Sequence, residues 1–182
     1  WVEAVSHQAQ TLAHVSNLFT TGPQLDLAEK LLALAKAPEG SAVFLSNSGT
    51  EANEAAIKIC LVRKSGRIIV LDHAFHGRTL GALSLTHKIA YRQPFGPSAV
   101  DVTFITPEDP EILAGELEKG DISGVFVEPI QGEAGVVPLT DEYLQQVREL
   151  TAGYDALMVV DEVQCGMGRT GRWFAHQSAH IT

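Results

Sequence analysis

The segment from Ser46 to Glu51 carries the first residues able to do chemistry. It reads Ser-Asn-Ser-Gly-Thr-Glu, follows an apolar run and precedes a stretch of helical spacing. Backbone N–H groups and hydroxyls at a helix N-terminus can bind a phosphate. An N-cap, with Glu51 or Glu54 complementing the helix dipole, is the other interpretation. The segment alone leaves both open, although it is neither a P-loop nor a G-x-G-x-x-G motif.

Two adjacent carboxylates, Asp161 and Glu162, follow the apolar run from Leu157 to Val160. A carboxylate at the end of a buried strand contacts a ligand or binds a metal ion. With Glu128, the pair could hold a divalent cation in a metal-dependent, phosphatase-like site. However, Pro129 and the Gly-rich loop after Asp161 add no oxygen ligands, which favours a contact with an organic ligand and predicts no metal site.

The histidines and cysteines give weaker signals. His73 and His76 have i, i+3 spacing, but Gly77 follows at once and predicts a loop, so we expect ordinary loop histidines and not metal ligands. Cys60 and Cys165 are the only cysteines, which excludes a disulfide framework and a four-cysteine zinc site. Neither cysteine stands beside an obvious base, which argues against a thiol nucleophile.

The elements that must position these residues alternate between two periodicities. Helical spacing is found at 2–14, after 21–23, and at 51–63, 110–118 and 141–151. Short apolar runs typical of buried strands are found at 42–45, 67–71, 100–105, 124–127 and 156–160. This order predicts an α/β fold with a mostly parallel sheet and no internal domain boundary.

Ligands of open parallel sheets bind beyond the carboxyl ends of the strands. The polar segments that follow the predicted strands are residues 46–51, 72–78, 128–133 and 161–172. If all four open on one edge of the sheet, they build a single site.

Composition limits the class of protein. The 182 residues are 45% hydrophobic and 19% charged, which is typical of one globular domain. A net charge of -9 argues against nucleic acid and anionic membranes as partners, because both require clustered Lys and Arg. No apolar run reaches the roughly 18 to 20 residues that cross a bilayer, and no export signal is visible, so we expect a cytoplasmic location.

Five strings in order resemble the class III, fold-type I aminotransferases, which depend on pyridoxal 5'-phosphate. The strings are Ser46–Ala55, Phe75–Leu80, Val127–Glu133, Val160–Gln164 and Gly166–Gly171. The resemblance covers essentially the whole chain and looks closest to the acetylornithine aminotransferases. It implies the three-layer α/β/α large domain of fold-type I enzymes, with a mostly parallel sheet, incomplete in this chain.

The resemblance also implies how the cofactor is held. Gly49 and Thr50 would bind its phosphate with backbone N–H groups, helped by the Thr50 hydroxyl. Phe75 would stack on one face of the pyridine ring, and Val163 would close the other. Asp161 would pair with the protonated ring nitrogen and is the expected catalytic residue.

Three further roles are implied by the same resemblance. Gln164 would bond near the phenolic oxygen of the cofactor. Arg78 would receive a substrate carboxylate or acyl group, because the guanidinium fork suits such groups. Glu133 would act as a gate that pairs with a downstream arginine absent from this chain. Cys165 stands where the family more often has Thr.

The lysine to which the family attaches its cofactor lies in a later segment, and the chain ends at Thr182 before it. None of the six lysines stands in the matching position. We therefore expect residues 1–182 to be part of the cofactor-binding large domain, without the N-terminal arm, the lysine segment or the small C-terminal domain, and to be inactive alone.

The reaction implied for the whole enzyme is transfer of an amino group from N-acetylornithine to 2-oxoglutarate in arginine biosynthesis. Its products would be N-acetylglutamate semialdehyde and glutamate, and its expected assembly is a homodimer. Enzymes for ornithine, succinylornithine, aminoadipate-type substrates and 4-aminobutyrate share these strings, so those donors stay open. A noncatalytic cofactor-binding fragment is an alternative of another class.

Overall fold

The structure is a computed structural model that describes residues 1–16 and 18–181, so residues 17 and 182 lie outside the description. The chain divides into two compact units, with the boundary between Val43 and Phe44. The first unit contains α1 (Val2–Thr11) and α2 (Gly22–Ala35), neither of which has a buried residue. The proposed site lies wholly in the second unit.

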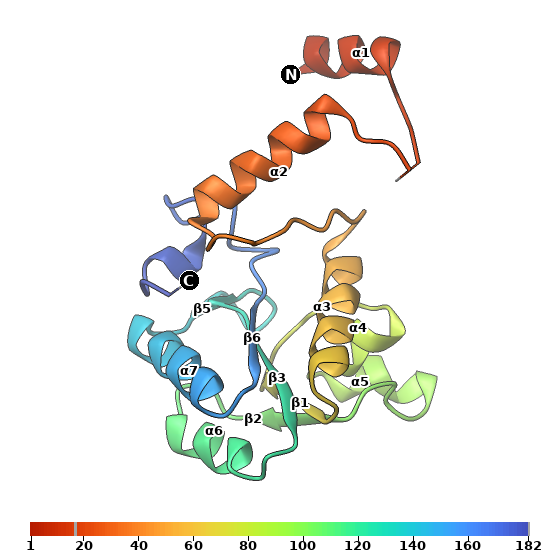
Figure 1. Cartoon of the computed structure of the whole chain (residues 1–182). Coiled ribbons are helices and arrows are strands. Elements are labelled where there is room, and N and C mark those ends of the chain that lie inside the picture. Colours follow the sequence, from red (N-terminus) through yellow and green to blue (C-terminus); the bar gives the residue numbers. More distant parts are fainter. Residues whose placement is uncertain (17, 182) are drawn as a thin grey trace. The chain divides into compact units, whose positions relative to one another are not determined.

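The second unit is built on a four-stranded sheet (Figure 1). Its strands are β1 (Arg67–Leu71), β2 (Val102–Ile105), β3 (Ile122–Val127) and β6 (Leu157–Val160). They follow the order β2-β1-β3-β6, and every neighbouring pair is parallel. The predicted parallel sheet is thereby confirmed, and the carboxyl ends of all four strands share one edge.

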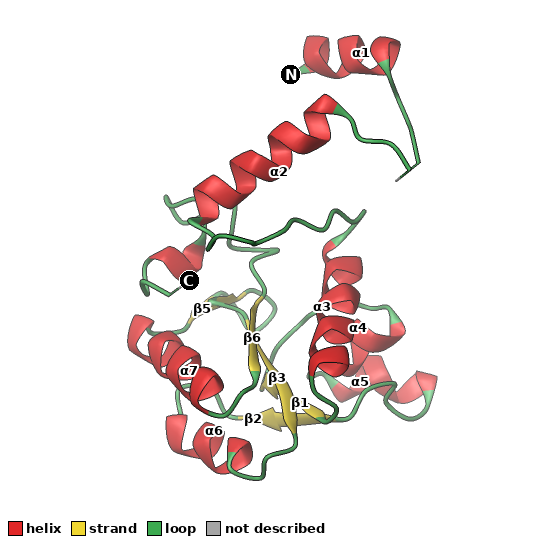
Figure 2. Ribbon diagram, in the orientation of Figure 1, coloured by secondary structure: helices red, strands yellow, loops and turns green. Residues whose placement is uncertain are grey.

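Helices cover both faces of this sheet (Figure 2). One face carries α3 (Gly49–Arg63), α4 (Leu80–Ser84) and α5 (Ile89–Arg92), and the other carries α6 (Pro110–Leu117) and α7 (Asp141–Gly153). Two separate apolar cores result, because alternate residues of a strand point to opposite faces. Ile57 of α3 packs in the core that contains Ile68 and Val70, whereas Leu113 of α6 packs in the core that contains Ile69.

Short elements complete the unit. A hairpin pairs β4 (Ile130–Gln131) with β5 (Val137–Pro138) in antiparallel register. Single 3-10 turns are found at Gln93–Phe95 and Ala175–Gln177. Within the described part of the chain, no helix has the length and apolarity needed to cross a membrane.

The prediction of a strand at Ala42–Leu45 is wrong. These residues have no regular structure, and Phe44 and Leu45 are 69% and 43% exposed. A strand is stabilised by hydrogen bonds to a neighbouring strand, and none of the described strands pairs with this segment. Its apolar composition alone could not make it part of the sheet.

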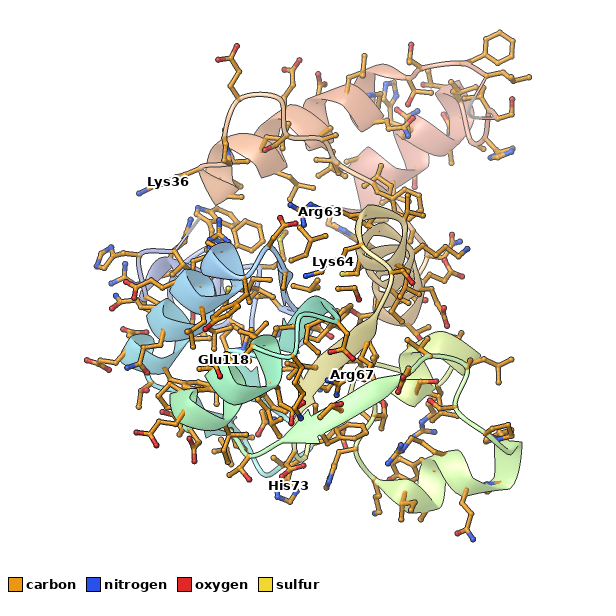
Figure 3. The ribbon with its side chains drawn as sticks, turned by 60° about the horizontal axis from the view of Figure 1, so that its bottom comes forward. Lys36, Arg63, Lys64, Arg67, His73 and Glu118 are labelled. Atoms are coloured by element: carbon orange, nitrogen blue, oxygen red, sulfur yellow. The ribbon has the colours of Figure 1, made fainter. Side chains whose placement is uncertain are left out.

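Charged residues hold the opposite, amino-terminal edge of the sheet. Arg67, labelled in Figure 3, begins β1 and donates to Asp121 through Nε at 2.8 Å. Its guanidinium also lies 3.2 Å from the carboxylate of Glu116 on α6. These contacts tie β1 to its neighbours at the edge away from the polar segments, and they leave Arg67 no role in a site at the other edge.

Candidate functional site

The four polar segments predicted to converge do so in a cavity of about 400 Å³ at the carboxyl edge of the sheet. It is lined by Ser48, Gly49, Thr50, Asn53, Phe75, His76, Gly77, Arg78, Glu128, Asp161, Val163 and Gln164. The set includes seven of the eight residues to which the resemblance assigns a role in binding or catalysis. Glu133 is the exception, since it lines an adjoining cavity of about 340 Å³ that shares Phe75. The roles of these residues stay predictions.

The first turn of α3 supplies free hydrogen-bond donors. Ser48 is the N-cap, and its hydroxyl accepts from the Glu51 N–H at 3.3 Å. The Glu51 carboxylate accepts from the Asn47 N–H at 2.8 Å. The N–H groups of Gly49 and Thr50 have no acceptor among the described residues. The cap satisfies only part of the helix N-terminus. The free N–H groups of Gly49 and Thr50, called here the anion cradle, can therefore bind an anion beside it.

Two glycines let the chain segments of the site approach each other. A Cβ on Gly49 would lie 2.6 Å from Val163 Cγ2, closer than side chains can come. Gly77 has a φ of +133°, and a Cβ there would overlap the Thr50 hydroxyl. Only glycine fits both positions, so the N-terminus of α3 contacts the loop after β6 and the turn after β1 directly.

Asp161 is the carboxylate of the cavity that accepts the most hydrogen bonds from the described residues. It is 8% exposed, and its Oδ2 accepts from Asn53 Nδ2 at 2.8 Å and from His76 Nδ1 at 2.7 Å. Its Oδ1 accepts from the Val163 N–H at 3.0 Å. Burial opposes ionisation, but the hydrogen bonds from His76, Val163 and Asn53 outweigh it and lower the pKa of Asp161. Asp161 is therefore an anion at neutral pH, with acceptor capacity left on Oδ1.

The hydrogen bond to Asp161 places a proton on His76 Nδ1. An ionised carboxylate only accepts, so the nitrogen that faces it must donate. His76 Nε2 is buried without a hydrogen-bond partner among the described residues. Asn53 donates its other amide hydrogen to the His76 carbonyl at 2.8 Å. His76 and Asn53 thus orient Asp161.

His76 was interpreted from the sequence as an ordinary loop histidine. That interpretation suits His73, which is exposed at the periphery (Figure 3), but it overlooks the contact of His76 with Asp161. The string Phe75–Leu80 could have indicated that His76 belongs to the site, because it contains His76 between two residues of the expected site, Phe75 and Arg78. The spacing of the two histidines could not reveal a partner 85 positions away.

Glu128 is a second buried carboxyl in the cavity. It is 3% exposed, and its Oε2 accepts from the Phe75 N–H at 3.0 Å. Burial raises the pKa of Glu128 to about 7, the charges of Asp161 and Glu133 act in the same direction, and His76 opposes them. The sequence placed Glu128 in the polar segment 128–133 expected at the site, but suggested a specific role for it only as a partner of a metal ion.

The two adjacent carboxylates, Asp161 and Glu162, have different partners, and only Asp161 lines the cavity. Glu162 turns away and accepts from the N–H groups of Ala175 at 2.6 Å and His176 at 2.8 Å. Burial opposes its ionisation, yet the bonds from His176 and Ala175 lower the pKa of Glu162. Within residues 1–16 and 18–181, no group of three or more His, Cys, Asp or Glu side chains is arranged to hold a metal ion.

Arg78 and Gln164 complete the cavity wall. The Arg78 guanidinium lies 5.8 Å from the centroid of the Phe75 ring and 5.5 Å from that of Tyr91. Within the described part of the chain no carboxylate pairs with Arg78, so its fork is available to an anion. Gln164 is packed so closely against Gly132 that a Cβ at position 132 would overlap the Gln164 amide.

Comparison with known proteins points to one family. The family model described as Aminotransferase class-III matches residues 1–182. The chain is 47% identical over 181 residues to an acetylornithine aminotransferase of Mycobacterium bovis. That alignment covers all of this chain and 45% of the relative, so the chain spans about half the length of the curated relatives it matches.

Solved structures give the same result. The N-acetylornithine aminotransferase of Stenotrophomonas maltophilia superposes with a TM-score of 0.80 at 38% identity, over 100% of this chain and 45% of that one. The ornithine aminotransferase of Toxoplasma gondii, described with partial occupancy of PLP at its active site, superposes with a TM-score of 0.90 at 28% identity, over 99% of this chain and 44% of that one.

Proposed function

The chain belongs to the class III aminotransferases, and from this premise we propose that residues 1–182 form part of the large domain that binds pyridoxal 5'-phosphate. The whole enzyme would transfer an amino group from N-acetylornithine to 2-oxoglutarate, giving N-acetylglutamate semialdehyde and glutamate for arginine biosynthesis. The relatives named acetylornithine aminotransferase at 45% and 47% identity support this choice of donor.

The cavity fits this cofactor at three places. The free N–H groups of Gly49 and Thr50 suit a phosphate, and the missing Cβ of Gly49 lets Val163 pack directly against this first turn of α3. Phe75 and Val163 both line the cavity and offer apolar surfaces to a flat ring. The ionised Asp161 suits a protonated ring nitrogen.

The single observation that carries the proposal is the environment of Asp161. When bound, pyridoxal phosphate withdraws electrons from the amino-bearing carbon of the substrate. Asp161 would hold the proton on the ring nitrogen, because three donors keep this buried carboxylate ionised. His76 and Asn53 would fix its orientation before the ligand arrives, which avoids reorganisation on binding.

The remaining cavity residues would bind and orient. Gln164 would donate to the phenolic oxygen of the ring, and the exposed guanidinium of Arg78 would receive the carboxylate or acyl end of a substrate. Glu133 would act as the gate from the adjoining cavity. We further propose a cytoplasmic homodimer as the assembly of the whole enzyme.

Cofactor binding is tested by mixing the 182-residue chain with pyridoxal phosphate, reducing with borohydride and mapping modified lysines by mass spectrometry. No lysine lines the cavity, so we expect saturable noncovalent binding without a stoichiometric adduct at any of the six lysines. A stoichiometric adduct at one of them would contradict this assignment of the site.

The amino donor is tested in the complete enzyme that carries this sequence. We expect the highest kcat/KM with N-acetylornithine, and lower values with ornithine, succinylornithine and 4-aminobutyrate. A preference for one of the other donors would assign the enzyme to the subgroup that uses that donor. The assignment of the cofactor site would not change. Glutamate formation by the 182-residue chain alone would exclude the alternative of a noncatalytic cofactor-binding fragment.

A further inference from the structure

Glu54 joins the helix that carries the cradle to the next helix. It lies on α3 one turn after Thr50, and its Oε1 accepts from the N–H groups of Gly81 at 2.8 Å and Ala82 at 3.1 Å. The same oxygen accepts from the Thr79 hydroxyl at 2.5 Å. These donors belong to the start of α4, whose own N-cap, Thr79, makes no side-chain capping bond. Glu54 therefore caps α4 from another helix.

The charge of Glu54 fixes the direction of two hydroxyl protons. Burial opposes ionisation of Glu54, but the bonds from Thr79, Ala82 and Gly81 lower its pKa, so it is a carboxylate at neutral pH. A carboxylate accepts, so Thr79 must give it its only hydroxyl proton. The Thr50 and Thr79 hydroxyls lie 3.0 Å apart, so Thr50 must donate in that bond. The Thr50 oxygen also accepts from the Thr79 N–H at 3.4 Å.

Close packing leaves this arrangement little freedom. A Cβ on Gly81 would overlap the Glu54 carboxylate, and a Cβ on Gly77 would overlap the Thr50 hydroxyl. The turn from Gly77 to Thr79 is thus held directly against the first turn of α3. This turn follows Phe75 and includes Arg78, so Glu54 acts on two walls of the cavity at once.

We propose that Glu54 is a positioning residue for the anion cradle at Gly49 and Thr50. It commits the Thr50 hydroxyl proton to Thr79, so the cradle presents backbone N–H groups to a phosphate and the hydroxyl donates nothing to it. The proposal rests on the proposed function, because the phosphate is that of the cofactor. It revises the expectation that the Thr50 hydroxyl helps to bind the phosphate.

Two probes separate the cradle from the rest of the cavity. Pyridoxamine 5'-phosphate and pyridoxamine share the ring, and only the first carries a phosphate. Neither has an aldehyde, so neither reacts with surface lysines. The Kd of each is measured by titration with the 182-residue chain, and far-ultraviolet circular dichroism checks that each variant is folded. If the unchanged chain bound neither probe saturably, the proposed function itself would fail.

Glu54→Ala is expected to raise the Kd of pyridoxamine phosphate about 10-fold or more and that of pyridoxamine less than about 2-fold. Removing the negative charge of Glu54 would by itself strengthen the binding of a phosphate. Weaker binding in Glu54→Ala therefore indicates that the positioning of the cradle is lost. Glu54→Gln keeps an acceptor oxygen and should bind the phosphate probe at least as tightly as the unchanged chain. Equal losses for both probes, or no loss, would overturn the proposal.

The proton direction has its own test in Thr50→Val. This variant keeps the shape and both backbone N–H groups but loses the bond to Thr79, so the Kd of pyridoxamine phosphate should rise by less than it does in Glu54→Ala. A rise that exceeds that of Glu54→Ala would show that the hydroxyl donates to the phosphate, and would overturn the proton assignment. If Glu54→Ala does not fold, Glu54→Asp replaces it, because the shorter carboxylate cannot keep all three bonds, and the same selective loss is expected.

Discussion

At the scale of single residues, the site depends on side chains that lie far apart in the sequence. Asp161 could be predicted because a carboxylate at the end of an apolar strand has few structural uses. Its partners could not, because Asn53 is 108 positions away and His76 is 85. Periodicity describes one element at a time and says nothing about which side chains meet between elements.

The charge of Asp161 is the first property to test. Asp161→Asn removes the anion that would face the ring nitrogen and that His76 Nδ1 contacts. We expect the Kd of pyridoxamine phosphate to rise by about 10-fold or more, because hydrogen bonds to charged groups contribute about 1.5 to 3 kcal/mol. Titration gives the Kd, and Asp101→Asn, at an exposed position, is the matched control. An unchanged Kd in Asp161→Asn would remove this residue from the site.

Glu128 gives stability a dependence on pH. Its folded pKa is about 7 against an ordinary 4.5, so its contribution to stability is complete below 4.5 and is lost as the pH rises through 7. Glu128→Gln is neutral at every pH and can still accept from the Phe75 N–H. Relative to this variant, the unchanged chain should lose up to about 3 kcal/mol of unfolding free energy between pH 4.5 and 8. Urea denaturation at several pH values measures the difference, and parallel curves for the two proteins would contradict the prediction.

At the scale of elements, the long helices and the four strands of the sheet were predicted, and the short helices were not. The predicted helices at 51–63 and 141–151 correspond to α3 and α7. The helices α4 and α5 were not predicted, since five and four residues are too few for a periodic pattern. Yet α4 is held by Glu54, so a short element outside the sequence prediction shapes the site.

The close approach of α3 to the loop after β6 is tested by Gly49→Ala. Alanine favours a helix over glycine by up to about 1 kcal/mol, but its Cβ would meet Val163 Cγ2 at 2.6 Å. We expect pyridoxamine phosphate to bind about 10-fold more weakly or worse, because Val163 must move into the cavity. Gly115→Ala on α6 is the matched control, since nothing lies within 4 Å of its Cβ. It should leave the Kd unchanged, and an equal effect of both variants would argue against the steric explanation.

At the scale of the whole molecule, the α/β class followed from the alternation of strands and helices, but the strand order β2-β1-β3-β6 did not. Strand order depends on which neighbours pair, and every strand is similarly apolar. The segment Ala42–Leu45 shows the same limit, because its composition is that of a strand and it has no partner among the described residues. The chain divides into two compact units in the structure. That residues 1–182 belong to a single domain stays a prediction.

All residues that line the proposed cofactor cavity belong to the second unit, so ligand binding must stabilise that unit. One of the two tryptophans, Trp173, lies in it, and Trp1 lies in the first unit with 94% exposure. In Trp1→Phe, fluorescence therefore reports the second unit alone. Pyridoxamine phosphate at 100 times its Kd should raise the unfolding free energy seen by Trp173 by about 2.7 kcal/mol. The gain should be lost in Asp161→Asn at the same concentration. If the denaturation midpoint of Trp1→Phe did not move under saturating ligand, the ligand would be bound outside the folded second unit, and the cavity would not be its site.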